Sequence, residues 1–131
     1  MDLAAVNYLH WGKPKVWYVV AGEDGKKMQK RIEEALSDHT KLCANIMRHK
    51  DYIVTRKFLQ LNNINYKVLQ QNAGEFIVTF PCAFHQGFNL GINFAEATNF
   101  ATAHWLKFGQ EAVQCSCGRI EPVFDMDIFN N

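Results

Sequence analysis

The chain has 131 residues, which is enough for one domain with a buried core. Hydrophobic residues make up 48% of it and charged residues 21%, which is typical of a globular protein and excludes a disordered one. The formal net charge is +1, so we expect no broad basic surface for nucleic acid. The longest uncharged stretch, from Phe76 up to Glu96, is interrupted by Pro81 and two glycines, so it does not predict a membrane helix.

The first half of the chain predicts one strand followed by helices. Lys15–Ala21 is apolar, β-branched and aromatic, which predicts a buried strand. Glu23–Leu36 has apolar residues at helical spacing and charges on the other face, which predicts an amphipathic helix. Two shorter helices are predicted, one around Lys41–Arg48 and one after the potential N-cap Thr55. A turn follows at Asn62-Asn63.

From Tyr66 onward the pattern changes to short strands separated by turns. Three strands are predicted here: Tyr66–Gln71, Glu75–Phe80 and one near Gly91–Ala95. Pro81 ends the second strand, because proline cannot donate to a sheet, and the loop after it contains His85. His104–Ala112 predicts a helix. Strands joined by short turns and flanked by helices indicate an antiparallel α+β or mostly β fold.

Three of the four cysteines and one histidine form a candidate metal set: Cys43, His49, Cys115 and Cys117. Three thiols and one imidazole suit tetrahedral Zn²⁺ with no open position. Their spacing matches no common zinc finger, so three buried free cysteines remain an alternative. No secretory signal follows Met1-Asp2, so we expect thiols or metal ligands rather than disulfides. Cys82 is interpreted as a small buried hydrophobic residue.

The segment from Gly74 to Asn99 combines one histidine with several amides. His85 lies just past a predicted strand and before a glycine, where it could hold a ligand or a metal. A single histidine in such a place is more often a hydrogen-bonded core residue. Asn89 and Asn93, like Asn99, lie beside apolar residues, and buried amides need partners. The segment therefore predicts a polar cavity in a β-core.

Asn7 and Lys15 flank the first predicted strand in NYLHWGKPKVWY. A lysine at the start of an apolar strand can point its ammonium group into a cavity and hold a carboxylate. The alternative is a solvated lysine at the end of a strand.

Taken together, these segments resemble the Jumonji-C (JmjC) histone lysine demethylases, from Met1 to about Phe129. The resemblance is strongest in Asn7–Tyr18, in Gly74–Ala101 and in the CSC of Cys115–Cys117. The best match is the zinc-containing subfamily that acts on di- and trimethylated lysine 9 and lysine 36 of histone H3. Residues 1–131 are thus expected to form one partial JmjC domain.

The resemblance implies a fold and a zinc site. The expected fold is a mostly β, double-stranded β-helix (a jelly-roll or cupin-like core), incomplete at the N-terminus and flanked by helices. The expected structural zinc joins the segments 43–49 and 115–117, with Cys43, His49, Cys115 and Cys117 as its ligands.

The resemblance also implies roles around an iron atom. His85 matches the distal histidine of a triad in which two histidines and a carboxylate hold Fe(II) and leave positions open for 2-oxoglutarate and O₂. Lys15 matches the lysine that pairs with the far carboxylate of 2-oxoglutarate, and Asn7 matches the amide that contacts the carboxylate near the metal. Trp17 matches an aromatic residue that lines the cosubstrate pocket.

The implied substrate is methyl-lysine in the tail of histone H3, which would place the protein in the nucleus. Ala97, Thr98 and Asn99 fall where the family shapes the methylammonium pocket, and Lys50 falls near the mouth of the active site. Ala97 stands where some relatives have serine, a difference expected to affect the preference among methylation states. The implied reaction is an N-methyl hydroxylation that releases formaldehyde and succinate.

One departure from the family pattern concerns the iron ligands. The family's H-x-E or H-x-D motif lies just before the segment that opens this chain, and Met1-Asp2-Leu3 matches the residues that follow it. His49 has Asp51 two residues later, but the zinc set already uses it. The chain is therefore expected to be a fragment of a longer demethylase that is inactive when isolated; the alternative is a shortened gene product that has lost catalysis.

Two other functions compete with this interpretation. One is a non-catalytic, zinc-stabilised Jumonji-like module that binds chromatin proteins. The other is a protein or small-molecule hydroxylase of related fold, against which the resemblance of the four candidate zinc ligands to the demethylase subfamily argues. Oligomeric state is not predicted by the sequence.

Overall fold

The computed structural model describes residues 2–40, 43, 46–112, 115, 117 and 125–129, and the fold within these ranges is built from two small antiparallel sheets. The strands are β1 (Ala4–Gly12), β2 (Lys15–Val20), β3 (Lys67–Gln71), β4 (Phe76–Thr79), β5 (Phe84–Asn89) and β6 (Asn93–Phe100). The α-helices are α1 (Glu23–Ala35), α2 (Ser37–Thr40), α3 (Arg56–Leu61) and α4 (Leu106–Glu111). Short 3₁₀ turns are η1 (Ile46–His49), η2 (Ala103–Trp105) and η3 (Met126–Phe129).

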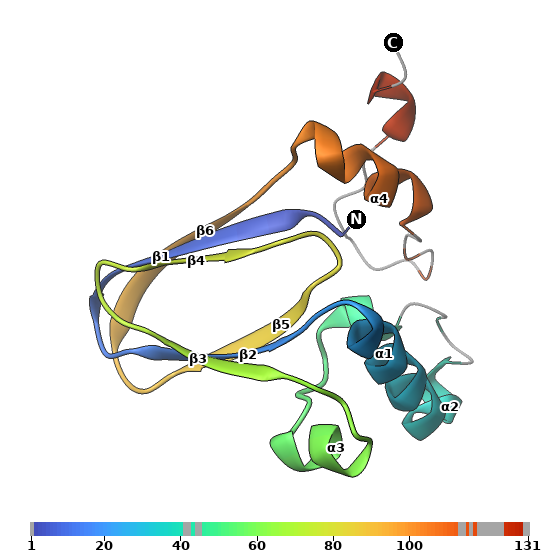
Figure 1. The fold of residues 1–131 in the computed structure, drawn as a ribbon, viewed down its shortest axis with the longest axis horizontal. Coiled ribbons are helices and arrows are strands. Elements are labelled where there is room, and N and C mark those ends of the chain that lie inside the picture. Colours follow the sequence, from blue (N-terminus) through green and yellow to red (C-terminus); the bar gives the residue numbers. More distant parts are fainter. Residues whose placement is uncertain are drawn as a thin grey trace.

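The two sheets face each other as layers of a sandwich (Figure 1). The first sheet has the order β4-β1-β6 and the second has the order β3-β2-β5, with every pair antiparallel. The chain crosses from the first sheet to the second at Gly12, whose φ is +100°. A Cβ at this position would lie 2.5 Å from the carbonyl oxygen of Ile92, so only glycine fits the crossing.

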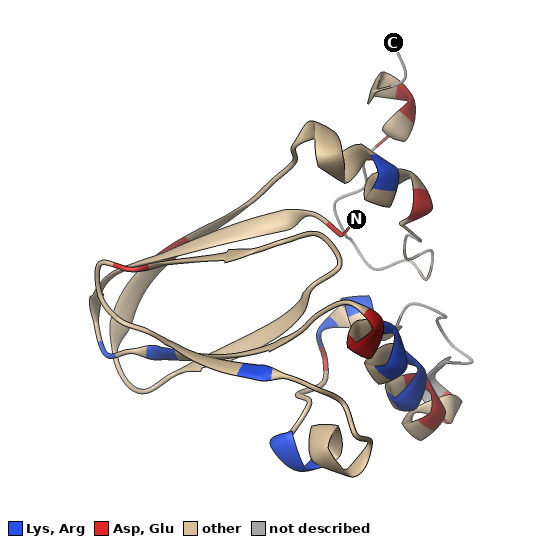
Figure 2. Ribbon diagram, viewed as in Figure 1, with Lys and Arg blue, Asp and Glu red and all other residues tan. Residues whose placement is uncertain are grey.

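Helices α1 and α3 lie against the second sheet, at the end of the sandwich where β2 finishes (Figure 1). The buried core there joins Val20 at the end of β2 to Met28 and Ile32 of α1 and to Leu59 of α3. Charged side chains gather mainly on α1, with both signs present, while the strands carry few (Figure 2). The amphipathic pattern of α1 therefore buries one stripe on the sheet and leaves the charges in water.

Thr55 caps α3 as predicted, since its hydroxyl oxygen accepts a hydrogen bond from the amide of Phe58 at 3.1 Å. The strand Lys15–Val20, the helix Glu23–Ala35 and the turn at Asn62-Asn63 are also confirmed. Of the helix predicted around Lys41–Arg48, only the 3₁₀ turn that begins at Ile46 is described, and residues 41, 42, 44 and 45 lie outside the described ranges.

The prediction for the segment around His85 was wrong. His85 lies within strand β5 and not in a loop, and the strand predicted near Gly91–Ala95 runs instead from Asn93 to Phe100. Asn7 lies in the middle of β1 and does not flank the first strand. The residues of β5 are mostly weak strand formers, and its strand structure depends on pairing with β2.

The side chain of Gln71 connects the two sheets in the interior. Gln71 is fully buried, and its Oε1 accepts a hydrogen bond from the indole N–H of Trp17 in the second sheet at 2.9 Å. Its Nε2 donates to the carbonyl of Asn7 at 3.2 Å and to that of Glu75 at 3.0 Å. One amide thus serves a side chain of the second sheet and the backbone of the first.

The architecture agrees with the predicted mostly β core with flanking helices. No helix in the described ranges has both the length and the apolar character needed to cross a lipid bilayer.

We expect Gln71→Leu to lower the free energy of unfolding by about 1–3 kcal/mol, because the buried indole N–H of Trp17 loses its acceptor. Urea unfolding followed by circular dichroism measures this change. Gln70→Leu on the same strand is the matched control, because Gln70 is exposed, and its effect should stay within about 0.5 kcal/mol. Equal effects of the two substitutions would contradict the bridging role of Gln71.

Candidate functional site

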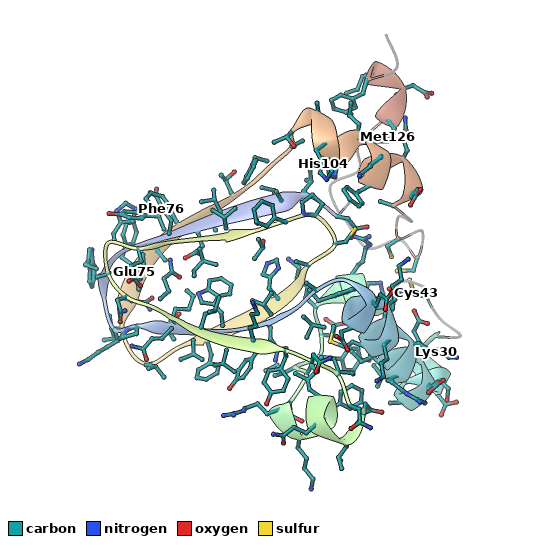
Figure 3. All side chains as sticks on the ribbon, viewed as in Figure 1. Lys30, Cys43, Glu75, Phe76, His104 and Met126 are labelled. Carbon is teal, nitrogen blue, oxygen red and sulfur yellow. The ribbon has the colours of Figure 1, made fainter. Side chains whose placement is uncertain are left out.

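The four residues of the candidate metal set lie together at the helical end of the sandwich. Figure 3 labels Cys43 beside α1, at the end of the molecule opposite Glu75 and Phe76. The ligand atoms of Cys43, His49, Cys115 and Cys117 all lie within 4.8 Å of one another. The structure therefore brings together residues from the middle and the end of the chain, as the sequence predicted.

The distances within this Cys/His cluster suit a tetrahedral zinc site. The Sγ atoms of Cys43 and Cys115 are 3.5 Å apart, and those of Cys115 and Cys117 are 3.0 Å apart. His49 Nε2 lies 3.2 Å from the Sγ of Cys115 and 3.3 Å from the Sγ of Cys117. Tetrahedral zinc with ordinary Zn–S bonds separates two sulfurs by about 3.8 Å, so the sulfurs would move slightly apart to admit one ion between the four ligands.

Proton binding competes with metal binding at this cluster. The hydrogen bond with Cys117 is the largest cause that raises the pKa of the Cys115 thiol to about 11. A free Cys115 is therefore protonated at neutral pH, and zinc must displace its proton. Zinc affinity is consequently expected to fall as the pH is lowered.

The predicted cosubstrate residues of β2 lie on one face of the second sheet, toward the first sheet. Lys15 and Trp17 are two positions apart on β2, so both side chains point to this inner face. Across the ladder with β5, Lys15 is opposite Asn89, and the residue opposite Val19 is His85. The alternation of both strands thus gathers Lys15, Trp17, His85 and Asn89 on a single surface.

Lys15 is held by neutral groups. Its Nζ donates to the Oδ1 of Asn89 at 2.6 Å and lies 5.6 Å from the centre of the Trp17 ring. Gly87 makes room for this indole, because a Cβ there would lie 3.1 Å from a carbon of the Trp17 ring and 2.9 Å from the carbonyl oxygen of Val16. No carboxylate forms an ion pair with Lys15 in the part of the chain that the structure describes, so an anionic ligand could pair with its ammonium group.

His85 has a defined ring orientation. Its Nδ1 lies 3.0 Å from the carbonyl oxygen of Ala83, which can only accept, so Nδ1 carries the proton and donates. The lone pair is therefore on Nε2, the arrangement that a metal-binding histidine uses. The ring centre lies 6.1 Å from that of Trp17.

The described residues do not by themselves fit an iron site. Among them, the only group of three or more histidine, cysteine or carboxylate side chains close enough to hold a metal is the Cys/His cluster. His85 is not part of such a group, and one imidazole cannot supply the triad that the resemblance implies. The missing H-x-E or H-x-D motif is thus not replaced from elsewhere in the described ranges.

Asn7 lies on β1 of the first sheet, where its strand partners are Ile77 and Ala97. Its Oδ1 is buried and has no hydrogen-bond partner among the described residues. A buried amide oxygen in this condition requires a partner such as water or a bound ligand. Asn7 therefore fits a residue that contacts a small molecule between the sheets.

The predicted substrate residues are only partly brought together. Ala97, Thr98 and Asn99 follow one another on β6, so Thr98 points to the opposite face of the sheet from its two neighbours. Lys50 follows His49 at the helical end of the molecule and is exposed, with a φ of +57°. No hydrogen bond within the described ranges links Lys50 to β6.

Three residues that position the candidate site were not identified as such from the sequence. They are Gln71, Gln86 and Gly87. The alternation of β3 places Gln71 on the same face as Leu69, which could have suggested an inward amide. Nothing in the local pattern of β5 distinguishes Gln86 from a solvated glutamine.

Comparison with known proteins agrees with this fold. The family model described as "JmjC domain, hydroxylase" matches residues 1–100. Because this match covers most of the chain, the protein belongs to the JmjC domain family, and its core is the double-stranded β-helix expected of that family.

Its relatives are lysine-specific demethylases, as the resemblance predicted. The chain is 45% identical to a probable lysine-specific demethylase 4F of Homo sapiens and 44% identical to lysine-specific demethylase 4D of Rattus norvegicus, each over 129 residues. It is 40% identical to lysine-specific demethylase 4B of Mus musculus, also over 129 residues. Each alignment covers 98% of this chain but only 20%, 25% and 12% of the respective relative.

Metal analysis of the purified chain is expected to find about one zinc ion per chain, by the logic of four protein ligands. Cys115→Ser should lower both the zinc content and the melting temperature, because it removes the sulfur closest to the other ligands. Cys82→Ser is the control, since Cys82 lies outside the Cys/His cluster and is exposed, so its interpretation as a buried hydrophobic residue was wrong. An unchanged zinc content in Cys115→Ser would refute the assignment.

Proposed function

We propose that this chain is part of an Fe(II)- and 2-oxoglutarate-dependent dioxygenase domain that removes methyl groups from methyl-lysine in histone H3. The observation that carries the proposal is the inner-face array of Lys15, Trp17, Asn89 and His85 opposite the unsatisfied amide of Asn7. The array combines a cation without an ion-pair partner, an aromatic ring and polar groups on the facing surfaces of two sheets. These are the features expected of a pocket for a small dicarboxylate.

The residues have distinct roles in this proposal. The ammonium group of Lys15 binds the far carboxylate of 2-oxoglutarate and exchanges its present neutral acceptor, the amide of Asn89, for a charged one. Trp17 forms the wall of the pocket, and its orientation is fixed by the hydrogen bond to Gln71 and by contact with Gly87. Asn7 contacts the cosubstrate at the other end, through its buried amide.

His85 is proposed as one iron ligand. Its protonated Nδ1 leaves Nε2 available, which supports this role. The described residues provide no further ligands of the triad, so the proposal requires two more from outside the described residues. For this reason the proposed oxidative step depends on iron ligands other than those that the described residues supply.

The substrate class comes from the relatives, whose names describe lysine-specific demethylases. We propose that Ala97 and Asn99 on β6 shape the pocket for the methylammonium group and that Lys50 lies near its mouth, whereas Thr98, on the opposite face of the sheet, acts through its place in the strand. The family resemblance supports lysine 9 or lysine 36 of histone H3 as the substrate and a nuclear location. No electrostatic feature of the chain opposes a basic peptide, since its net charge is only +1.

The Cys/His cluster is proposed to hold a structural zinc ion. Its four ligands leave no open position for a substrate, which supports a structural role. The zinc would join the segment 43–49 to the segment 115–117 and so close the helical end of the sandwich. Arg48, between these ligands in sequence, also pairs with Asp2 at 3.1 Å and fixes the start of β1 to the same region.

A non-catalytic, zinc-stabilised interaction module is the second candidate. It is favoured by one observation, the contrast between a complete Cys/His cluster and a lone His85. The coding sequence before Met1 discriminates between the two functions. An in-frame H-x-E or H-x-D motif supports the enzyme, whereas a true start codon without such a motif supports the module.

The isolated 131-residue chain is expected to show no demethylation of a trimethylated histone H3 peptide in the presence of Fe(II) and 2-oxoglutarate. The reason is that one histidine binds iron too weakly to replace a triad. Mass spectrometry of the peptide measures the loss of methyl groups, with the rat lysine-specific demethylase 4D as the positive control. Turnover by the isolated chain would contradict the fragment interpretation.

Lys15→Met is expected to weaken the binding of 2-oxoglutarate to the isolated chain about tenfold or more, because a charge-assisted contact is lost. Titration followed by the indole N–H resonance of Trp17 measures this affinity, since the indole lies beside the ammonium group. Lys13→Met is the matched control, because Lys13 lies in the exposed crossing between β1 and β2. Equal affinities of the two variants would argue against Lys15 as the carboxylate-binding residue.

A further inference from the structure

Strand β5 carries a second polar side chain next to His85, on the opposite face of the sheet. His85 and Gln86 are consecutive, so His85 points between the sheets and Gln86 points to the outer face, which the helices cover. The Oε1 of Gln86 accepts a hydrogen bond from the backbone N–H of Val54 at 2.9 Å. The Nε2 of Gln86 donates in turn to the backbone carbonyl of Val54.

These two hydrogen bonds resemble the backbone hydrogen bonds between neighbouring strands of a sheet. A side-chain amide offers one carbonyl and N–H donors with the geometry of a peptide group, so Gln86 pairs with Val54 as a residue of a neighbouring strand would. The segment 50–55 has no regular secondary structure of its own. The side chain of Val54 also packs against the core cluster that contains Val20 and Leu59. Val54 is thus attached to the sheet through both its backbone and its side chain.

The segment that Gln86 holds connects two important parts of the molecule. It begins directly after His49, a member of the Cys/His cluster, and ends at Thr55, which caps α3. Its first residue, Lys50, has a φ of +57°, a conformation that costs a non-glycine residue about 1–3 kcal/mol and is held by the surrounding structure. The cluster fixes one side, and the bond between Val54 and Gln86 fixes the other.

We propose that Gln86 is a positioning residue that couples the Cys/His cluster to the strand carrying His85. The connection runs from His49 along residues 50–53 to Val54, then through two hydrogen bonds to Gln86 and to the adjacent His85. Closure of the cluster around zinc fixes this path at one end and so restricts the movement of β5. The inference rests on the proposed zinc site and on the proposed role of His85.

The test compares the zinc-loaded full chain with Gln86→Met, which keeps a similar length and volume but removes both hydrogen bonds. Amide hydrogen exchange of Val54 is expected to become about tenfold faster in Gln86→Met, because its acceptor is lost. Gln70→Met is the matched control, since Gln70 is an exposed glutamine of the same sheet that bonds only to the nearby Asn72 among the described residues. Unchanged exchange of Val54 in Gln86→Met would show that Gln86 does not hold Val54.

A second readout tests the coupling. Removal of zinc by a chelator is expected to shift the backbone amide resonances of His85 and Gly87 in the wild-type chain, and to shift them less than half as much in Gln86→Met. Leu69, on the far edge strand β3, is the internal reference and should move little in either protein. Equal shifts of β5 in the two proteins, or an equal shift at Leu69, would overturn the coupling.

Two further outcomes separate this inference from the proposals on which it rests. If the purified wild-type chain contains no zinc, the metal assignment and the coupling both fail. The exchange of Val54 then still decides whether Gln86 holds Val54 in place. If Gln86→Met does not fold, Gln86→Asn replaces it, because asparagine keeps the amide but is one methylene too short to reach Val54. Faster exchange of Val54 in Gln86→Asn supports the role of Gln86 in holding Val54, and unchanged exchange contradicts it.

Discussion

The side-chain amide of Gln71 joins the two sheets at the depth where the predicted cosubstrate residues lie. It accepts from the indole of Trp17 and donates to the backbone of β1 at Asn7, so it holds the Trp17 ring in place and ties the second sheet to the first. A buried amide can make all these hydrogen bonds only when each of its partners is correctly placed. A buried polar group without a partner costs more free energy than a satisfied hydrogen bond contributes. Lys15 and His85 lie on the same face of the second sheet because of the pairing register between β2 and β5.

The Cys/His cluster makes a second link between distant parts of the chain, at the helical end of the sandwich. It brings Cys43 to Cys115, which are 72 residues apart in the chain, and lies next to the ion pair between Arg48 and Asp2. All four members of the cluster lie outside the strands, so the cluster acts directly on the segments that flank the sheets. Gln86 then transmits that constraint to β5, on the face opposite His85.

Local patterns predicted much of the fold. The apolar strand from Lys15, the amphipathic helix α1 and the cap at Thr55 were all recognised, because each depends on residues close in sequence. The sequence predicts a loop where strand β5 lies, because the histidine, glutamine, glycine and asparagine of this strand are poor strand formers on their own. Pairing with β2 stabilises β5, and a short stretch of sequence does not reveal this pairing.

The sequence by itself determined the chemistry that is available. It specified three thiols and an imidazole suited to zinc, a lysine beside a tryptophan, and one histidine without the rest of an iron triad. Only the tertiary structure decided which groups meet: the four ligands within 4.8 Å, the amide of Gln71 between the sheets and the amide of Gln86 on Val54. The physical reason is that these contacts join residues far apart in the chain, so they depend on its path in space and not on the periodicity of any one segment.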